Sequence, residues 1–384
     1  MTEPTLRIVD VTDVVRHLLA TGEIGGIPRL LVSIIENRAA LEGLRFCVFD
    51  ASCASFRVIG NPRSLDVSLL ERHDFSEAPD RLAAWIELCD PQLRAIDEEL
   101  LQGREAHFFF LSSQWDTLPG ADGFRFVSEF LARHRVTVLH HDSYLLDRGP
   151  RTPAAERFQG YWEAVVRSGR RIVFISEHTR RDFERHFGAC PQGVVAHYDF
   201  HFEYPRNTTG VDQGAVLLAD PARPYLTVFS IMDGRKSPLP VIRQLIDEGF
   251  RKRFEIALIV RFMTDDKPER IQLIDLVLMH DLKVFYSPND ATYLWLIKYA
   301  HAVFYPSLHE GFGMVPLDCK MFGKPCFIPG DADYGYLHDN ARSYQAQSGG
   351  RLDLASAEDP HSIHNNLMDF GNSGFADILF ELRR

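Results

Sequence analysis

The sequence has few cysteines and no metal-binding cysteine pattern. Its 384 residues include 6 cysteines, and no two of them form a CxxC pair. A chain of this length buries enough apolar surface to fold without disulfide bonds, so we interpret the cysteines as reduced thiols of a cytoplasmic protein. The one Asp-x-Asp triplet, at Asp331–Asp333, follows the last expected strand, where it is typical of a loop. We therefore expect no metal site and no cofactor.

An excess of basic residues and any long apolar run are also missing. The formal net charge is −11, which argues against nonspecific nucleic-acid binding. The N-terminus has no signal-peptide pattern, and no apolar run reaches the length of a membrane span. Arginines outnumber acids between Arg148 and His186. We interpret this segment either as a solvated helix face or as a face that meets anionic lipid, in peripheral association with the inner face of a membrane.

Three local signatures of common enzyme classes are absent as well. The sequence contains no GxSxG, no P-loop and no GxGxxG. What it does contain is a regular alternation of apolar strand patterns with helical patterns in two successive series, which predicts two doubly wound, mostly parallel sheets. Among the predicted helices are Leu82–Leu101, Ala154–Arg167, Ser176–Phe187 and Pro316–Phe322. In such folds ligands bind outside the carboxyl ends of the strands, so we expect the two domains to face each other across a cleft.

The domain boundary is predicted from a change in composition. Proline, glycine and polar residues gather between Tyr204 and Pro224. We predict an N-terminal Rossmann-like domain over residues 1–210, a linker over 211–224 and a C-terminal Rossmann-like domain over 225–360. A tail helix over 361–384 is expected to pack back on the first domain.

The densest chemistry follows the strand that ends near Tyr305. Glu310 precedes the flexible Gly311–Gly313 segment, and Asp318 stands eight residues after Glu310. A helix is expected from Pro316, with the N–H groups of Gly313, Met314 and Val315 at its N-terminus. This arrangement favours a diphosphate, and carboxylates are good acceptors for sugar and ribose hydroxyls.

These residues resemble a known signature. Glu310-Gly311-Phe312-Gly313 with Asp318 is similar to the EX7E motif of retaining GT-B glycosyltransferases, especially glycosyltransferase family four, and Gly323-Lys324-Pro325 is similar to the motif that follows it. The resemblance implies that Glu310 contacts the transferred sugar and that Asp318 binds the ribose. It also implies a donor site that includes Gly311, Phe312, Gly313, Met314 and Val315. The second acid is Asp here, whereas the family has Glu.

Two further segments resemble the donor and acceptor loops of that family. Arg235 and Lys236 follow the first strand of the second half, where the family neutralises the donor diphosphate without a metal. We favour Lys236 as the phosphate ligand; the alternative is a solvated turn. Gly25 and Gly26 precede Pro28 and resemble a loop that approaches the donor phosphate or the acceptor; the alternative is an ordinary turn.

The strand over residues 136–139 ends at His140-His141-Asp142. The resemblance implies that His141 lies near the reacting face of the sugar, where it donates a hydrogen bond or aligns the acceptor. The alternative for either histidine is a structural one. The segment that begins at Ser176 is also similar to the family, and there we expect Ser176 to cap a helix.

Taken together, the resemblance implies retaining transfer of a hexosyl group from a nucleotide-diphosphate sugar to a saccharide or lipid-linked saccharide, in polysaccharide or glycoconjugate biosynthesis. Retention in this family is attributed to front-face attack, in which the donor phosphate takes the acceptor proton. Two alternatives remain open. One is a non-catalytic sugar-nucleotide-binding subunit that partners an active transferase, and the other is a GT-B nucleotide-sugar epimerase.

Overall fold

The structure is a computed structural model. The described residues are 5–13, 15, 44–50, 55–59, 93–95, 105–111, 128–147, 152–196, 210–220, 222–232, 236–262, 267–334 and 341–344. They fall into two compact units, one within Met1–His201 and the other within Phe202–Phe370. The predicted tail helix over 361–384 lies outside the described residues, as do Gly25, Gly26 and Arg235.

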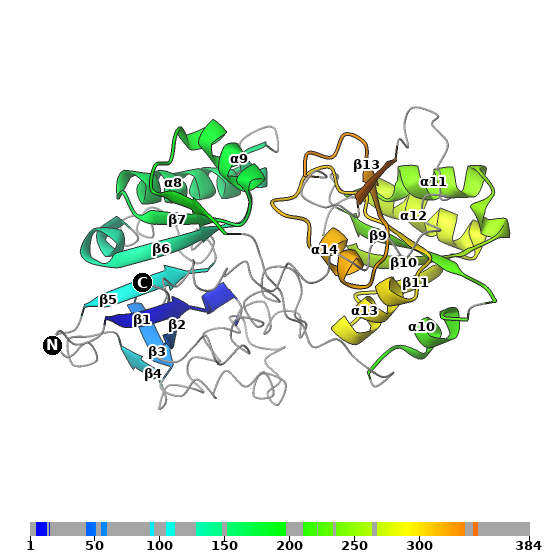
Figure 1. The fold of residues 1–384 in the computed structure, drawn as a ribbon, viewed down its shortest axis with the longest axis horizontal. Coiled ribbons are helices and arrows are strands. Elements are labelled where there is room, and N and C mark those ends of the chain that lie inside the picture. Colours follow the sequence, from blue (N-terminus) through cyan, green and yellow to red (C-terminus); the bar gives the residue numbers. More distant parts are fainter. Residues whose placement is uncertain are drawn as a thin grey trace. The chain divides into compact units, whose positions relative to one another are not determined.

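The first unit is built on an eight-stranded sheet with the strand order β4-β3-β2-β1-β5-β6-β7-β8 (Figure 1). Its strands are β1 Leu6–Asp10, β2 Leu44–Asp50, β3 Ser55–Ile59, β4 Leu93–Ala95, β5 Ala106–Phe110, β6 Arg135–His140, β7 Arg171–Phe174 and β8 Gly193–Val195. Strands β2, β1, β5, β6, β7 and β8 run parallel to one another, whereas β3 is antiparallel to both of its neighbours, β2 and β4. The alternating sequence pattern therefore produces the parallel sheet that it predicts.

Strand β4 corrects one prediction. The helix expected over Leu82–Leu101 does not include Leu93–Ala95, which pairs with β3 so that Leu93 lies opposite Ile59. Pro91 explains the difference, since proline removes a backbone donor and disfavours the helical conformation of the residue before it. A short apolar segment after that proline gains more from pairing at the sheet edge.

Helices cover one face of the first sheet. They are α7 Tyr144–Asp147, α8 Pro153–Arg167 and α9 Glu177–Phe187. As predicted, α9 is capped by Ser176, whose hydroxyl accepts a hydrogen bond from the backbone N–H of Thr179 at 3.0 Å. The apolar face of α8 places Tyr161 and Trp162 in a core that also holds Phe108 and Phe174 of the sheet. Burial of these rings fixes the carboxyl ends of β6 and β7.

The second unit contains a six-stranded, wholly parallel sheet with the order β11-β10-β9-β12-β13-β14. Its strands are β9 Tyr225–Met232, β10 Glu255–Phe262, β11 Lys283–Tyr286, β12 Ala302–Phe304, β13 Cys326–Pro329 and β14 Ala341–Tyr344. From β9 the chain continues to β10 and β11 on one side of the sheet, and from β12 it continues to β13 and β14 on the other side. Strands β9 and β12 are neighbours, so the topology creates a switch point between their carboxyl ends.

Helices cover both faces of this sheet (Figure 1). They are α10 Gln213–Leu218, α11 Leu239–Asp247, the 3-10 turn η4 Phe250–Lys252, α12 Lys267–His280, α13 Asp290–Lys298 and α14 Met314–Met321. Buried residues of α11 and α12 form a core with one face, and those of α10, α13 and α14 form a core with the other. Near-continuous apolar strands such as β10 are the expected result of burial on both sides.

Helix α10 lies within residues 211–224, the stretch predicted as a linker. Asp212 caps it, since its carboxylate oxygen Oδ1 accepts a hydrogen bond from the backbone N–H of Gly214 at 2.7 Å. Ala215 of this helix is fully buried in the core with α13. Residues 213–218 therefore pack with the second unit. The composition of the stretch does not reveal this, because the helix depends on its cap and on the burial of one face against α13.

In the part of the chain that the structure describes, no helix has the length and apolar character needed to cross a membrane.

Candidate functional site

The candidate site of the second unit lies at the switch point, where β9 and β12 end. The chain passes from β12 through Tyr305 and Ser307 to Glu310 and then enters α14. Gly313 caps this helix with φ +87°, a left-handed conformation that favours glycine. Helix α14 begins at Met314 rather than at the predicted Pro316, since proline is tolerated in a first helical turn.

The N-terminus of α14 has no side-chain cap among the described residues. Gly311, Phe312, Gly313 and Val315 are buried, and Met314 is half-buried. The segment predicted to bind a diphosphate is therefore closely packed, and the groups that it offers to a ligand are the backbone N–H groups at the start of the helix.

Glu310 is the acceptor of a dense polar cluster. Its oxygen Oε1 lies 2.6 Å from Nζ of Lys236, and it accepts hydrogen bonds from the hydroxyls of Tyr305 at 2.5 Å and Ser307 at 2.6 Å. The Lys236 ammonium also donates to the Tyr305 hydroxyl at 3.0 Å. The structure thus brings together two residues predicted for the site, Lys236 and Glu310, which follow different strands.

The ion pair is partly removed from water. The side chains of Lys236 and Glu310 are 10% and 14% exposed. Burial of a charge costs free energy unless a partner and hydrogen bonds compensate it, and three donors on one carboxylate oxygen provide that compensation. Such a pair adds little net stability compared with an apolar pair. A buried ion pair at the ends of two parallel strands is typical of a site that binds a charged ligand.

Asp318 occupies a different environment on α14. It is 1% exposed, and its oxygen Oδ2 accepts a hydrogen bond from the Tyr293 hydroxyl at 2.6 Å. Tyr293 belongs to α13, on the same face of the sheet. The acid predicted to bind ribose is therefore held inside the unit by a tyrosine.

A histidine–aspartate contact lies beside Glu310. Nδ1 of His309 and Oδ2 of Asp333 are 2.5 Å apart, and the backbone N–H of Asp333 donates to the carbonyl of Leu308 at 3.1 Å. These contacts tie the loop before α14 to the segment after β13. Asp333 belongs to the Asp-x-Asp triplet, and in this contact it orients a histidine side chain.

In the first unit, His141 lies where β6 ends. Its Nε2 is 2.7 Å from the carbonyl oxygen of Leu111, which follows β5. A carbonyl can only accept, so Nε2 carries the hydrogen and donates it, and Nδ1 of the neutral ring is an acceptor. Burial lowers the pKa of His141 below its usual value, opposed by the hydrogen bond to Leu111 and by Asp142. In this tautomer Nδ1 can only accept a hydrogen bond, whereas the sequence-based prediction for His141 was a donor or an acceptor-aligning group.

His140 is a structural residue. Its ring packs edge-on against Trp162 and Phe183, with ring centroids 4.5 Å and 4.9 Å apart, and its Nε2 lies 3.1 Å from the Ser143 hydroxyl. Burial lowers the pKa of His140 well below its ordinary value, and His141 and His186 lower it further. His140 stays uncharged and fills the aromatic core, as the structural alternative predicts.

Three hydroxyl residues around the two acids were not singled out from the sequence. Ser307 and Tyr305 precede Glu310 at the end of a strand, a position that could have drawn attention to them. Tyr293 gives no such signal, because it stands 25 residues before Asp318 on another helix.

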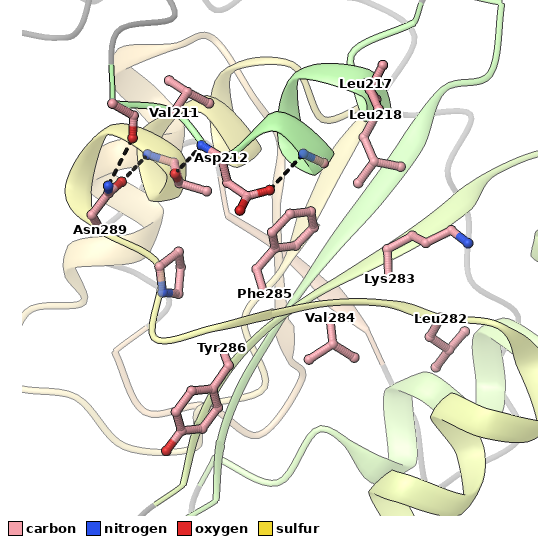
Figure 2. Close-up of a pocket in the computed structure, with 14 residues that line it drawn as sticks. Val211, Asp212, Leu217, Leu218, Leu282, Lys283, Val284, Phe285, Tyr286 and Asn289 are labelled. Atoms are coloured by element: carbon pink, nitrogen blue, oxygen red, sulfur yellow. Dashed lines mark hydrogen bonds between the residues drawn. The ribbon is translucent and has the colours of Figure 1, made fainter.

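A separate groove of about 820 Å³ lies along β11, the edge strand of the sheet (Figure 2). Leu217 and Leu218 of α10 line one side, and Phe285 and Tyr286 of β11 line the other. None of the residues predicted for the site lines it, so the groove is distinct from the cluster around Glu310.

Comparisons with known proteins add to this geometry. No family model and no curated protein matches the sequence. The structure is similar to HepE of Anabaena in complex with UDP and glucose, with a TM-score of 0.57 and 14% identity over 98% of this chain and 95% of that chain. It is also similar to sucrose-phosphate synthase of Thermosynechococcus elongatus, with a TM-score of 0.53 and 14% identity over 98% and 95%. WaaG, a glycosyltransferase involved in lipopolysaccharide biosynthesis, has a TM-score of 0.51 and 11% identity over 98% and 95%.

The chain has the GT-B fold. At identities of 11–14% the likeness concerns the fold alone, and it extends over nearly the whole of each chain. The prediction of two Rossmann-like domains with mostly parallel sheets is thereby confirmed. Residue roles within this fold rest on the geometry described above.

Proposed function

We propose that the chain transfers a hexosyl group from a nucleotide-diphosphate sugar to a saccharide or lipid-linked saccharide acceptor, with retention of anomeric configuration. The observation that carries the proposal is the contact between Lys236 and Glu310 at the switch point, beside the N-terminus of α14. A cation, a carboxylate and a helix N-terminus together match the charges and hydroxyls of a nucleotide sugar.

The donor diphosphate would bind the ammonium of Lys236, together with Arg235 and the N–H groups of Gly313, Met314 and Val315. Before the donor arrives, Glu310 compensates the charge of Lys236. When the diphosphate takes over Lys236, the Glu310 carboxylate becomes available to hydroxyls of the transferred sugar. Asp318 would serve the ribose.

The proposed reaction is a front-face substitution. The acceptor oxygen forms a bond to the anomeric carbon as the bond from that carbon to the phosphate oxygen breaks, and the departing phosphate takes the acceptor proton. Negative charge grows on the phosphate, and the fixed cations stabilise it without a metal. His141 would accept a hydrogen bond from a substrate hydroxyl at Nδ1, and Gly25 and Gly26 would approach the donor phosphate or the acceptor.

The fold neighbours support this class of substrate. HepE is described in complex with UDP and glucose, and WaaG acts in lipopolysaccharide biosynthesis. We propose a role in polysaccharide or glycoconjugate biosynthesis in the cytoplasm, peripheral to the membrane where the acceptor is lipid-linked. An equal rate in buffer with and without a metal chelator would support metal independence.

The test is release of nucleoside diphosphate from a panel of nucleotide sugars, each with and without saccharide acceptors. Glu310→Ala should lower the rate by at least about 100-fold, because the sugar-orienting carboxylate is lost. Glu248→Ala, at an exposed position directly after α11, is the matched control and should retain the wild-type rate. Equal rates in wild type and Glu310→Ala would refute the proposed role of Glu310.

One observation favours a second candidate, a sugar-nucleotide-binding subunit without catalysis. Asp318 is 1% exposed, and this burial restricts its access to a ribose. Nucleotide-sugar binding by calorimetry, without turnover on any acceptor, would support this candidate over the transferase.

A further inference from the structure

Glu310 and Asp318 share an unexpected feature: each accepts a hydrogen bond from a tyrosine hydroxyl. Tyr305 donates to Glu310 at 2.5 Å, and Tyr293 donates to Asp318 at 2.6 Å. Both rings pack edge-on against the same residue, Phe229 of β9, with centroid distances of 5.7 Å for Tyr305 and 5.6 Å for Tyr293. One buried phenylalanine therefore supports both acids through two tyrosines.

Tyr305 also contacts the cation of the site. Its hydroxyl oxygen accepts from Lys236 at 3.0 Å, and the Lys236 ammonium lies 5.4 Å from the centre of its ring. The ring is 4% exposed and directly follows β12, so packing restricts its rotamer. Because the Tyr305 hydroxyl donates to Glu310 and accepts from Lys236, it fixes the separation between these two charged groups.

Tyr293 contacts the other acid, Asp318. Its hydroxyl contacts Asp318 from α13, a helix that comes before β12 in the chain. An aspartate is one methylene shorter than the glutamate of the resembling family, so its carboxylate has less reach. A hydrogen bond to one oxygen fixes the direction in which the other oxygen faces.

We infer that Tyr305 and Tyr293 are positioning residues that divide the donor between them, an inference that rests on the proposed function. Tyr305 aligns Glu310 and Lys236 with the sugar and its diphosphate linkage. Tyr293 aligns Asp318 with the nucleoside. Neither hydroxyl is required to touch the reacting atoms, and each acts through the charged group that it holds.

The inference predicts a different kinetic effect for each of two substitutions that remove a single hydroxyl. Tyr305→Phe keeps the ring and removes the hydroxyl, and we expect kcat to fall about tenfold with the KM for the donor within about twofold. Tyr293→Phe should raise the KM for the donor about fivefold to tenfold and leave kcat within about twofold. Tyr299→Phe, at a residue that is 40% exposed beyond the end of α13, should change neither constant.

Binding separates this inference from the proposed transfer reaction. With UDP-glucose and UDP as probes in calorimetry, Tyr305→Phe should reduce the difference in affinity between the two ligands, whereas Tyr293→Phe should weaken both equally. Wild-type binding without turnover would refute the transfer reaction and leave this pattern to decide the inference. Equal effects of the two substitutions, or no effect, would overturn it, as would a wild type that binds neither ligand.

Discussion

The two units treat charge in different ways where the strands of their sheets end. In the second unit, the ends of β9 and β12 carry a charged pair, Lys236 with Glu310, supported by hydroxyl donors. In the first unit, the ends of β5 and β6 meet through His141 and the Leu111 carbonyl, and burial keeps that histidine neutral. The carboxyl ends of strands in two parallel sheets can thus carry a charged pair or a neutral ring.

The contrast extends through the interior of the first unit. Asp10 at the end of β1 is 1% exposed, and burial raises its pKa to about 7, although hydrogen bonds from Thr12 oppose the shift. Burial lowers the pKa of His107 to about 3, and Arg135, Arg171 and Arg7 lower it further. Burial therefore favours the neutral forms of Asp10 and His107 in the first unit, whereas Lys236 and Glu310 of the second unit compensate each other's charge.

The largest expected effect comes from breaking the charged pair. Lys236→Met leaves Glu310 buried without its cation, so we expect the free energy of unfolding to fall by about 3–5 kcal/mol and turnover to be lost. Urea denaturation and nucleoside diphosphate release measure the two effects. Lys236→Met combined with Glu310→Gln removes both charges and should recover much of the stability but no activity. If the single variant were as stable as the wild type, the pair would not be desolvated as described.

The neutral groups of the first unit predict opposing pH dependences. Folded Asp10 keeps its proton to about pH 7 while the unfolded chain releases it near pH 4, so stability falls as pH rises through this window, by about 1.4 kcal/mol per pH unit. Folded His107 stays neutral to about pH 3 while the unfolded chain takes up a proton below about pH 6.5, so its effect has the opposite sign.

These effects overlap between about pH 4 and 6.5 and should nearly cancel in the wild type. Asp10→Asn should then become more stable as pH rises across that range, and His107→Gln should become less stable. Urea denaturation at several pH values measures both slopes. Parallel curves for the two variants would show that these groups are solvated in the folded protein.

A smaller effect is expected at His141, which we propose contacts the substrate. His141→Phe removes the acceptor Nδ1 and the donor to Leu111, and we expect kcat/KM for transfer to fall about tenfold. His134→Phe, which precedes β6 at the opposite end of the strand, is the matched control. Equal activity of the two variants would place the reaction away from the end of β6.

The smallest effect tests whether α10 belongs to the second unit. Asp212→Ala removes the cap of this helix and should cost about 1 kcal/mol of unfolding free energy. Asp220→Ala removes a hydrogen bond to the Ala222 N–H in an exposed turn and should cost less. Chemical denaturation compares the two variants. A stretch that acts only as a linker would give no loss for either.

Several features of the fold were predictable because they are local. The period of apolar residues predicts α8 and α9, and Ser176 is recognised as a cap from its position just before a helical pattern. Strand β4 and helix α10 were not recognised, since each is short and depends on partners that are distant in the sequence: β4 on β3, and Ala215 on the core with α13.

For the candidate site, the sequence by itself determined the residue types and their order: Lys236 after one strand, then Glu310, a glycine turn and Asp318 after another. Only the tertiary structure decided which of them meet. The sheet order makes β9 and β12 neighbours, which brings Lys236 to Glu310, and helix packing brings Tyr293 to Asp318. Burial decides which groups stay neutral, because desolvation depends on everything packed around a side chain and not on the residues beside it in the chain.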